Sequence, residues 1–174
     1  MTIIDKKMIF MVLMIFTVSC SNNDYPEAPP KKDLISNILE YGDIYSYDQL
    51  MFYYYRDGLN NFPLAVHMVE NYGYKRACYD IFDMFYDTFK NEFIEIDTVT
   101  QNLLIYYLEK GISLGDTDCA WTMSHLYMDG LYVEKDTIKA KKCLMQVFTP
   151  IGVDTLFWPI VKKRTGQMRY NIKK

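Results

Sequence analysis

The sequence predicts an all-α domain whose paired helices stack as a right-handed α-α superhelix, that is, an α-solenoid. From Asp33 onward, apolar residues recur at three- and four-residue spacing, without sustained alternation of apolar and polar residues. In that region proline occurs only at Pro63, Pro150 and Pro159. Two segments also match each other at a shift of 42 residues, and periods near 40 built from two helices are typical of solenoids.

Eight helices are expected in chain order: Asp33–Tyr41, Ile44–Arg56, Phe62–Asn71, Tyr74–Phe89, Thr98–Ser113, Thr117–Asp129, Thr137–Phe148 and Val153–Lys163. Their ends carry matching signals. Asp97, with Gln101 downstream, and Asp136 supply side-chain acceptors for the free amides at two helix starts. Helix stops in the left-handed conformation are expected at Gly73, Gly115 and Gly130.

The matching segments indicate a repeat of two helices. Gly73, Ala77, Tyr79, Ile81, Met84 and Phe85 correspond to Gly115, Cys119, Trp121, Met123, Leu126 and Tyr127. The next helix start repeats at a shift of 39, from Asp97 to Asp136, so the first copy has three more residues in its preceding loop. Because a single pair cannot bury its apolar face alone, the pairs are expected to stack.

The expected helix Tyr74–Phe89 is apolar over most of its circumference, so neighbours must cover it on both sides. Its one polar stripe consists of Asp80, Asp83 and Asp87. This stripe is a candidate binding or calcium-loading face. A solvated face is the simpler interpretation, because no loop of oxygen ligands accompanies the three carboxylates.

Residues 107–120 read YLEKGISLGDTDCA, and residues 126–133 read LYMDGLYV. The stretch Tyr106–Leu144 resembles a Sel-one-like repeat, a relative of the tetratricopeptide repeat. That family usually has alanine at the place of Cys119 and glycine at the places of Ser124 and Tyr132. The resemblance implies about three helix pairs plus a terminal helix, with more degenerate copies at residues 42–55 and 73–86. It also implies an adaptor role, because family members mostly act in protein complexes.

The start of the chain has the features of an export signal. Lys6 and Lys7 precede an apolar run from Met8 to Val18, which is shorter than the roughly 20 residues that span a bilayer. Residues 17–20, Thr-Val-Ser-Cys, resemble the lipobox of bacterial lipoproteins. The resemblance implies cleavage before Cys20 and lipidation of its sulfur; an ordinary cleaved signal with an incidental cysteine is the alternative.

Four regions are therefore expected: a lipoprotein signal peptide (1–19), the lipidated cysteine with a flexible, proline-rich tether (20–32), the solenoid (33–165) and a basic tail (166–174). The protein would be lipid-anchored in the bacterial cell envelope. Because no aspartate directly follows Cys20, enterobacterial sorting rules imply the outer membrane. The periplasmic and the surface orientation both stay open.

Catalytic signals are weak. Residues 111–115 match the G-x-S-x-G pattern of a nucleophile elbow, but that motif requires a preceding strand, and Ser113 here lies between two expected helices. His67 and His125 are the only histidines, too few for the usual zinc sites. We therefore expect no enzyme, metal or cofactor. Hydrolysis of a cell-wall or β-lactam substrate through Ser113 is the alternative.

Cys78, Cys119 and Cys143 would lie in an oxidising compartment after export. Cys119 and Cys143 fall at comparable distances from one turn on antiparallel helices, so a disulfide could join them. Cys119 instead could simply pack where the family has alanine. Both interpretations stay open.

Charge and tyrosine content point to binding. Residues 33–133 contain 5 Lys/Arg and 16 Asp/Glu, whereas residues 134–174 contain 10 and 3. This asymmetry could steer a protein partner toward the chain. It could also place the basic end against an anionic surface; that end includes Lys162, Lys163 and Arg164. A solvated tail explains the asymmetry equally well. Tyr53, Tyr54 and Tyr55 cannot all point inward, so at least one is a candidate contact residue.

The function expected from these features is non-catalytic binding of a protein partner of unknown identity. The partner could be a toxin neutralised by this chain as an immunity protein, or a component of an envelope complex in which the chain is a structural spacer. Nucleic acid is a poor candidate, because the chain is acidic overall and expected to be exported.

Overall fold

The structure is a computed structural model that describes residues 27–92, 95–149, 153 and 157–164. Within these ranges every regular element is a helix, which confirms the all-α prediction. The elements are α2 (Lys31–Tyr41), α3 (Ile44–Tyr54), the 3₁₀ helix η1 (Tyr55–Asn61), α4 (Phe62–Tyr72), α5 (Lys75–Glu92), α6 (Thr98–Ser113), α7 (Thr117–Asp129), α8 (Thr137–Val147) and α10 (Trp158–Arg164).

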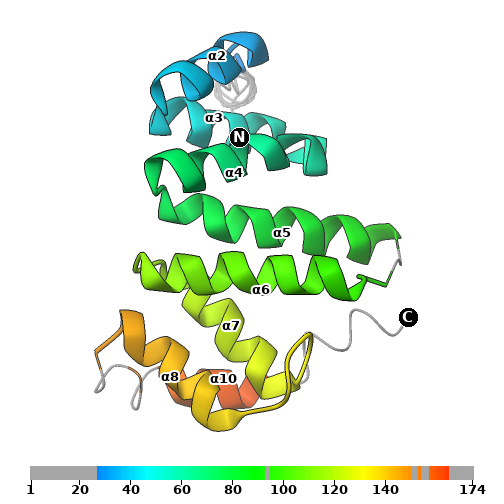
Figure 1. The fold of residues 1–174 in the computed structure, drawn as a ribbon, viewed down its shortest axis with the longest axis vertical. Coiled ribbons are helices and arrows are strands. Elements are labelled where there is room, and N and C mark those ends of the chain that lie inside the picture. Colours follow the sequence, from blue (N-terminus) through cyan, green and yellow to red (C-terminus); the bar gives the residue numbers. More distant parts are fainter. Residues whose placement is uncertain (1–26, 93–94, 150–152, 154–156, 165–174) are drawn as a thin grey trace, which may run out of the picture.

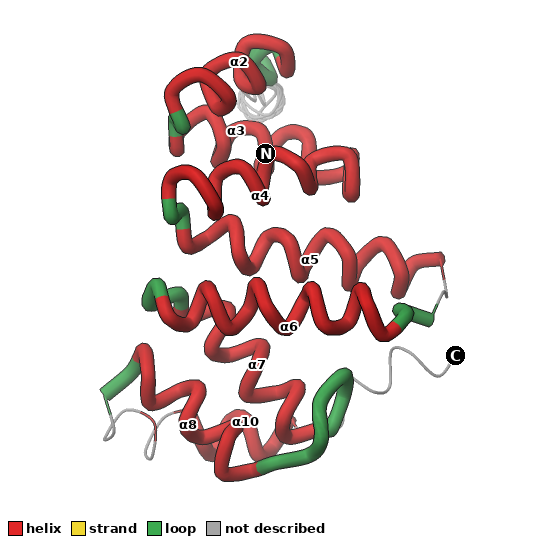
Figure 2. Tube along the Cα trace, in the orientation of Figure 1, coloured by secondary structure: helices red, strands yellow, loops and turns green. Residues whose placement is uncertain are grey.

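Helices α2 to α6 are layered along the long axis of the molecule in chain order, and α7, α8 and α10 lie together at the lower end (Figures 1 and 2). From α4 to α8 each helix packs against the next one, and α5 also reaches α7 while α6 reaches α8. The last helix, α10, packs against α7. Helix α5 thus has neighbours on both sides, as its nearly continuous apolar circumference requires.

Aspartate side chains cap the starts of four of these helices. Asp97 accepts hydrogen bonds from the backbone amides of Val99 and Thr100, and Asp136 accepts them from two amides at the start of α8, as predicted. Asp43 and Asp116 cap α3 and α7 in the same way. The predicted capping partner Gln101 does something different: its side-chain amide donates to the carbonyl of Ile96, 2.6 Å away.

Most helix boundaries lie within three residues of the prediction, but α10 begins at Trp158, five residues after its expected start. Two of the smaller differences have a visible cause. The helix expected to end at Arg56 ends at Tyr54, because the chain passes into η1 and Gly58 adopts a non-helical conformation with φ 53° and ψ −126°. Helix α2 begins at Lys31, inside the expected tether. There the Tyr54 hydroxyl donates to the Pro29 carbonyl (2.8 Å) and Lys31 forms an ion pair with Asp57.

Positions that match in the sequence repeat have matching environments. Ala77 and Cys119 are both fully buried, and so are Ile81 and Met123. Gly73 and Gly115 both have positive φ angles, 61° and 80°. Tyr132 is the one described residue other than glycine with a positive φ, 60°. Its conformation is the left-handed one that favours glycine, the residue of the Sel-one-like pattern at this place.

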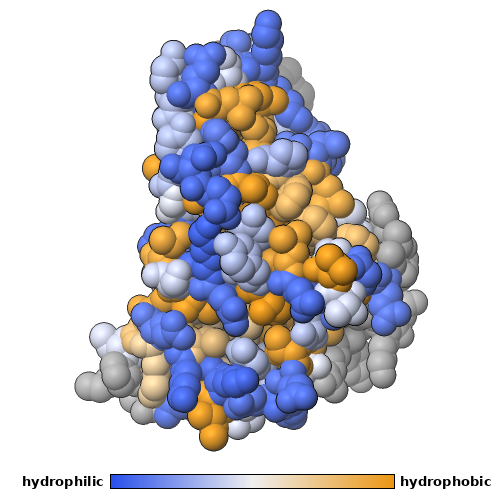
Figure 3. Space-filling model, in the orientation of Figure 1, coloured by the Kyte–Doolittle hydropathy of each residue, from blue (hydrophilic) through white to orange (hydrophobic). Residues whose placement is uncertain are grey.

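The buried side chains form one long core from α2 to α8 and a smaller one around Met128, Ala140, Leu144 and Val153. On the face seen in Figure 3, hydrophobic residues are interspersed with hydrophilic ones. Over the described residues, no helix combines the length and the apolar character needed to cross a membrane.

Candidate binding groove

A groove of about 580 Å³ runs along α3, η1, the start and middle of α5 and the first residues of α7. We call it the acidic groove, because five carboxylates and only two cationic side chains line it. The lining residues are Asp48, Met51, Phe52, Tyr55, Tyr74, Lys75, Arg76, Asp80, Asp83, Asp116, Thr117 and Asp118.

Asp80 is part of a buried polar network and not of a solvated stripe. Only 7% of its surface is exposed. Its carboxylate accepts hydrogen bonds from the Tyr47 hydroxyl (3.0 Å) and from Nε of Arg76 (3.2 Å). Burial raises the pKa of Asp80 to about 6, against the opposing effect of Arg76. The solvated interpretation is therefore wrong for this residue.

The same Arg76 side chain joins α5 to α7, because its guanidinium also donates to Asp118 at 2.8 Å. Lys75 makes a second link by donating to the carbonyl of Gly115 at 3.1 Å. At the α3 end of the acidic groove, the Tyr74 hydroxyl donates to Asp48, 2.8 Å away. The charged walls of the groove are thus held in place from neighbouring helices.

The structure brings Tyr55 together with Asp83 and Asp87, three of the predicted site residues. The Tyr55 hydroxyl lies 2.8 Å from a carboxylate oxygen of Asp83 and 2.9 Å from one of Asp87, so the two acids share its single proton. Both aspartates are half-buried. Burial raises the pKa of Asp83, and burial together with the nearby carboxylates raises that of Tyr55.

The other two predicted tyrosines do not line the groove. Tyr54 is half-buried and bonded to the chain at Pro29, as described above. Tyr53 is half-buried, and its ring packs edge-on against Phe52 with 4.9 Å between centroids.

Of the groove residues, the sequence interpretation named only Tyr55, Asp80 and Asp83, and Phe52 is one of those that it missed. Phe52 is 75% exposed, so its ring is available for contact with a partner. Asp48, Phe52 and Tyr55 follow each other at four- and three-residue intervals, so they fall on one helical face. That spacing was a usable signal. Asp116 and Asp118 had no comparable signal, because only the packing of α7 beside α5 brings them to the groove.

The basic end is not part of the acidic groove. Lys163 lies exposed in α10. The side chains of Lys162 and Arg164, the expected basic tail 166–174 and the expected lipidation site Cys20 lie outside the described residues.

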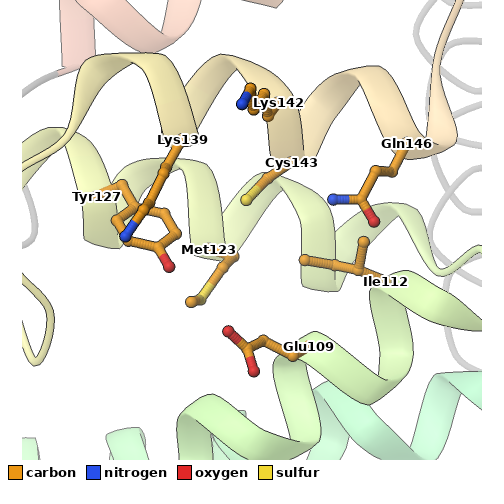
Figure 4. A pocket seen from close by; sticks show the side chains of 8 residues that line it. All are labelled: Glu109, Ile112, Met123, Tyr127, Lys139, Lys142, Cys143 and Gln146. Atoms are coloured by element: carbon orange, nitrogen blue, oxygen red, sulfur yellow. The ribbon is translucent and has the colours of Figure 1, made fainter.

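A second, smaller pocket of about 310 Å³ lies between α6, α7 and α8. Figure 4 shows Glu109 of α6 across from Lys139 of α8, with the Cys143 sulfur between the helices. The Lys139 ammonium lies over the Tyr127 ring, 5.6 Å from its centroid. Burial raises the pKa of Cys143 to about 11, so the thiol stays protonated and weakly nucleophilic at neutral pH.

Cys78, Cys119 and Cys143 are all free, buried thiols, so Cys119 and Cys143 pack without a disulfide between them. Cys119 packs against Gly111 of α6. A Cβ atom added at Gly111 would collide with the Cys119 sulfur and would lie 2.9 Å from Cβ of Cys78. The glycine therefore sets the close approach of α5, α6 and α7.

This contact also accounts for the G-x-S-x-G pattern. Gly111 serves packing, Gly115 takes the left-handed turn, and the exposed Ser113 donates its hydroxyl proton to the Lys110 carbonyl at 2.6 Å. The motif covers the end of helix α6 and the turn before helix α7, whereas a nucleophile elbow follows a strand.

The two histidines lie in separate places. Nδ1 of His67 is hydrogen-bonded to the side chain of Asn71 (2.8 Å), and His125 is buried beside the Trp121 ring. In the part of the chain that the structure describes, no group of three His, Cys, Asp or Glu side chains could hold a metal ion.

No protein-family model, curated protein or solved structure matches this chain. The resemblance to Sel-one-like repeats thus stays a prediction, and functional inference depends on the acidic groove.

Proposed function

We propose that the chain is a non-catalytic protein-binding module, held in the bacterial envelope by a lipid on Cys20, and that the acidic groove is its docking face. One observation carries the proposal. The groove joins α3, α5 and the start of α7. In the repeat that we propose below, these are the first helices of three successive helix pairs. A surface that continues from one repeat to the next is what helical-repeat proteins use for binding.

We further propose that the stack is a right-handed superhelix of Sel-one-like repeats. The equal burial of Ala77 and Cys119, the positive φ of Gly73 and Gly115 and the left-handed Tyr132 support this assignment. So does the contact of Gly111 with Cys119, because close packing of successive helices needs small residues at the crossing.

The chemistry of the acidic groove suits a protein partner. Interfaces are enriched in aromatic residues, and exposed Phe52 together with Tyr55 and Tyr74 supplies them here. The groove carboxylates are already positioned by hydrogen bonds from Tyr47, Tyr74 and Arg76. A partner would therefore not have to order these side chains, and this lowers the entropy cost of binding.

Immunity against an envelope-targeted toxin is the sharper form of this proposal. A small protein that inhibits by occupying another protein's surface needs a rigid face and charge complementarity, not catalytic groups. The acidic face from α3 to α7 provides fixed side chains and an excess of negative charge, which a cationic partner surface would complement.

A capture experiment tests the binding role. The full chain and its Phe52→Ala variant serve as baits for envelope and secreted proteins, and Tyr41→Ala is the matched control because Tyr41 is 72% exposed outside the groove. One stoichiometric partner retained by wild type and Tyr41→Ala, but weakened by Phe52→Ala, is the expected result. Equal retention of the partner by all three baits would mean that it docks outside the groove.

Two cell experiments test the remaining parts. If the partner is a toxin, cells that express the chain survive its delivery and cells that lack the chain do not. Replacement of Cys20 by serine is expected to move the protein from the membrane fraction to the soluble fraction, because acyl chains provide the attachment. Membrane attachment that persists in Cys20→Ser would refute the anchor.

A further inference from the structure

We propose that the acidic groove binds an extended, arginine-bearing segment of the partner protein. This inference depends on the proposed binding role and specifies the chemistry of the partner. It follows from the charge, the fixed geometry and the aromatic surface of the groove.

Negative charge dominates the groove. Its five aspartates face only two cations, Lys75 and Arg76, and both cations are engaged with groups of this chain. A partner that brings positive charge therefore meets an excess of carboxylates. Cationic side chains would be drawn to the groove at low salt and less so at high salt.

The carboxylates are fixed but not saturated. Asp48 uses one oxygen to accept from Tyr74, and Asp83 accepts from Tyr55 and, at 3.4 Å, from Tyr79. A carboxylate offers about four lone-pair positions. Each of these two aspartates can therefore accept further hydrogen bonds from a bound guanidinium without leaving its present partners.

Arg76 shows how a guanidinium fits between these helices. Its Nε donates to Asp80 of α5 while its terminal nitrogen donates to Asp118 of α7. The spacing between adjacent helices thus allows one planar group to reach two carboxylates. Arginine suits such a site better than lysine, because its nitrogens form a rigid fork and lysine is a point charge.

Phe52 supplies the apolar part of the recognition. Its ring is 75% exposed and lines the groove one helical turn from Asp48. A guanidinium can lie on an aromatic face while it donates to a nearby carboxylate. The ring and the carboxylates together thus favour arginine over an apolar or an acidic side chain.

The span of the groove sets the length of the segment. Tyrosine hydrogen bonds join α3 and η1 to α5, and Arg76 joins α5 to α7. With neighbouring helices about 10 Å apart, the three walls of the groove cover on the order of 20 Å. An extended chain rises about 3.3 Å per residue, which gives about six residues across the groove. An eight-residue peptide of alternating arginine and alanine is therefore an adequate probe.

Fluorescence anisotropy with the full chain tests the proposal. Three labelled eight-residue peptides are compared, with arginine, glutamate or leucine alternating with alanine. We expect saturable binding of the arginine peptide only, weakened by added salt. Asp48→Asn and Phe52→Ala should each weaken it by about threefold or more. Asp33→Asn and Tyr41→Ala, which remove an exposed acid and an exposed aromatic side chain elsewhere, should leave it unchanged.

Each other outcome overturns the inference. Preference for the glutamate or leucine peptide would assign the groove to a partner of different chemistry. Equal affinity of the arginine peptide for all four variants would place its binding elsewhere on the acidic surface. A captured partner whose retention depends on Phe52 but not on arginine would leave the proposed function standing and refute the arginine segment alone.

Discussion

The ionisation of Asp80 is expected to make the stability of the fold depend on pH. The carboxyl group is 7% exposed, and burial raises its pKa from 3.8 to about 6. The groups facing it act in both directions: Arg76 and the Tyr47 hydroxyl favour the charged form, while Asp83 opposes it. Burial is the largest of these effects, so Asp80 holds its proton to a higher pH in the folded state than in the unfolded state.

The direction of the change in stability with pH follows from the number of protons that each state binds. Between pH 3.8 and about 6 the folded state holds a proton on Asp80 that the unfolded state has released. The contribution of Asp80 to stability is therefore complete below about pH 4 and is lost as the pH rises through about 6. One pKa unit corresponds to about 1.36 kcal/mol, so the whole change is about 3 kcal/mol.

Urea unfolding of the wild type and of Asp80→Asn at several pH values between 4 and 8 measures this contribution. The asparagine cannot ionise but keeps an oxygen that accepts from Tyr47. The stability of Asp80→Asn relative to wild type should therefore rise by about 2.4 kcal/mol between pH 4 and pH 7, which is most of the whole change. Groups that titrate identically in both proteins cancel in this difference.

Tyr47→Phe extends the experiment. Removing this hydroxyl takes away a hydrogen bond that favours the charged carboxylate, so the pKa of Asp80 should increase and the pH window should move upward. A difference between wild type and Asp80→Asn that stays constant from pH 4 to pH 8 would refute the reasoning, because it would mean that Asp80 titrates alike in both states.

Three further substitutions test how a close helix contact, a buried hydroxyl and a helix cap contribute to the stability of the fold. Gly111→Ala should lower the free energy of unfolding by about 2 kcal/mol, because the clash with Cys119 outweighs the better helix propensity of alanine; combination with Cys119→Ala should restore part of the loss, and an unchanged urea midpoint would contradict the close approach. Ser124→Ala should stabilise the fold by about 1 kcal/mol in the same assay, because the Ser124 hydroxyl is buried without a hydrogen-bond partner; a loss of stability would mean that the hydroxyl is satisfied. Asp136→Ala should cost about 1 kcal/mol, because two amides at the start of α8 lose their acceptor; a melting temperature equal to that of wild type would show that the cap contributes nothing.

Much of the fold could be predicted from the sequence because its signals are local. Apolar spacing, aspartate caps and glycine stops act within a few residues of where they stand. Helices α6 and α7 accordingly have the predicted bounds, Thr98–Ser113 and Thr117–Asp129. The prediction that the helix from Ile44 continues to Arg56 is wrong, because α3 ends at Tyr54 and the chain passes into η1, where Gly58 has a non-helical conformation.

The candidate site was predicted only in part, because its contacts join residues far apart in the chain. Helical spacing showed that Asp80, Asp83 and Asp87 share one face but not which helix covers that face. The hydroxyl of Tyr47 bonds to Asp80, which lies 33 positions later in the chain, and the hydroxyl of Tyr55 bonds to Asp83, which lies 28 positions later.

The sequence by itself therefore predicted the all-α class, the order of the helices and, for α6 and α7, their bounds. Only the tertiary structure decided that Asp80 is buried, that Cys119 packs against Gly111 and that Phe52 stands exposed beside fixed carboxylates. The physical reason is the range of the forces involved. Backbone hydrogen bonding and side-chain periodicity are set by neighbours in the chain, whereas desolvation and charge pairing depend on which helices meet in space.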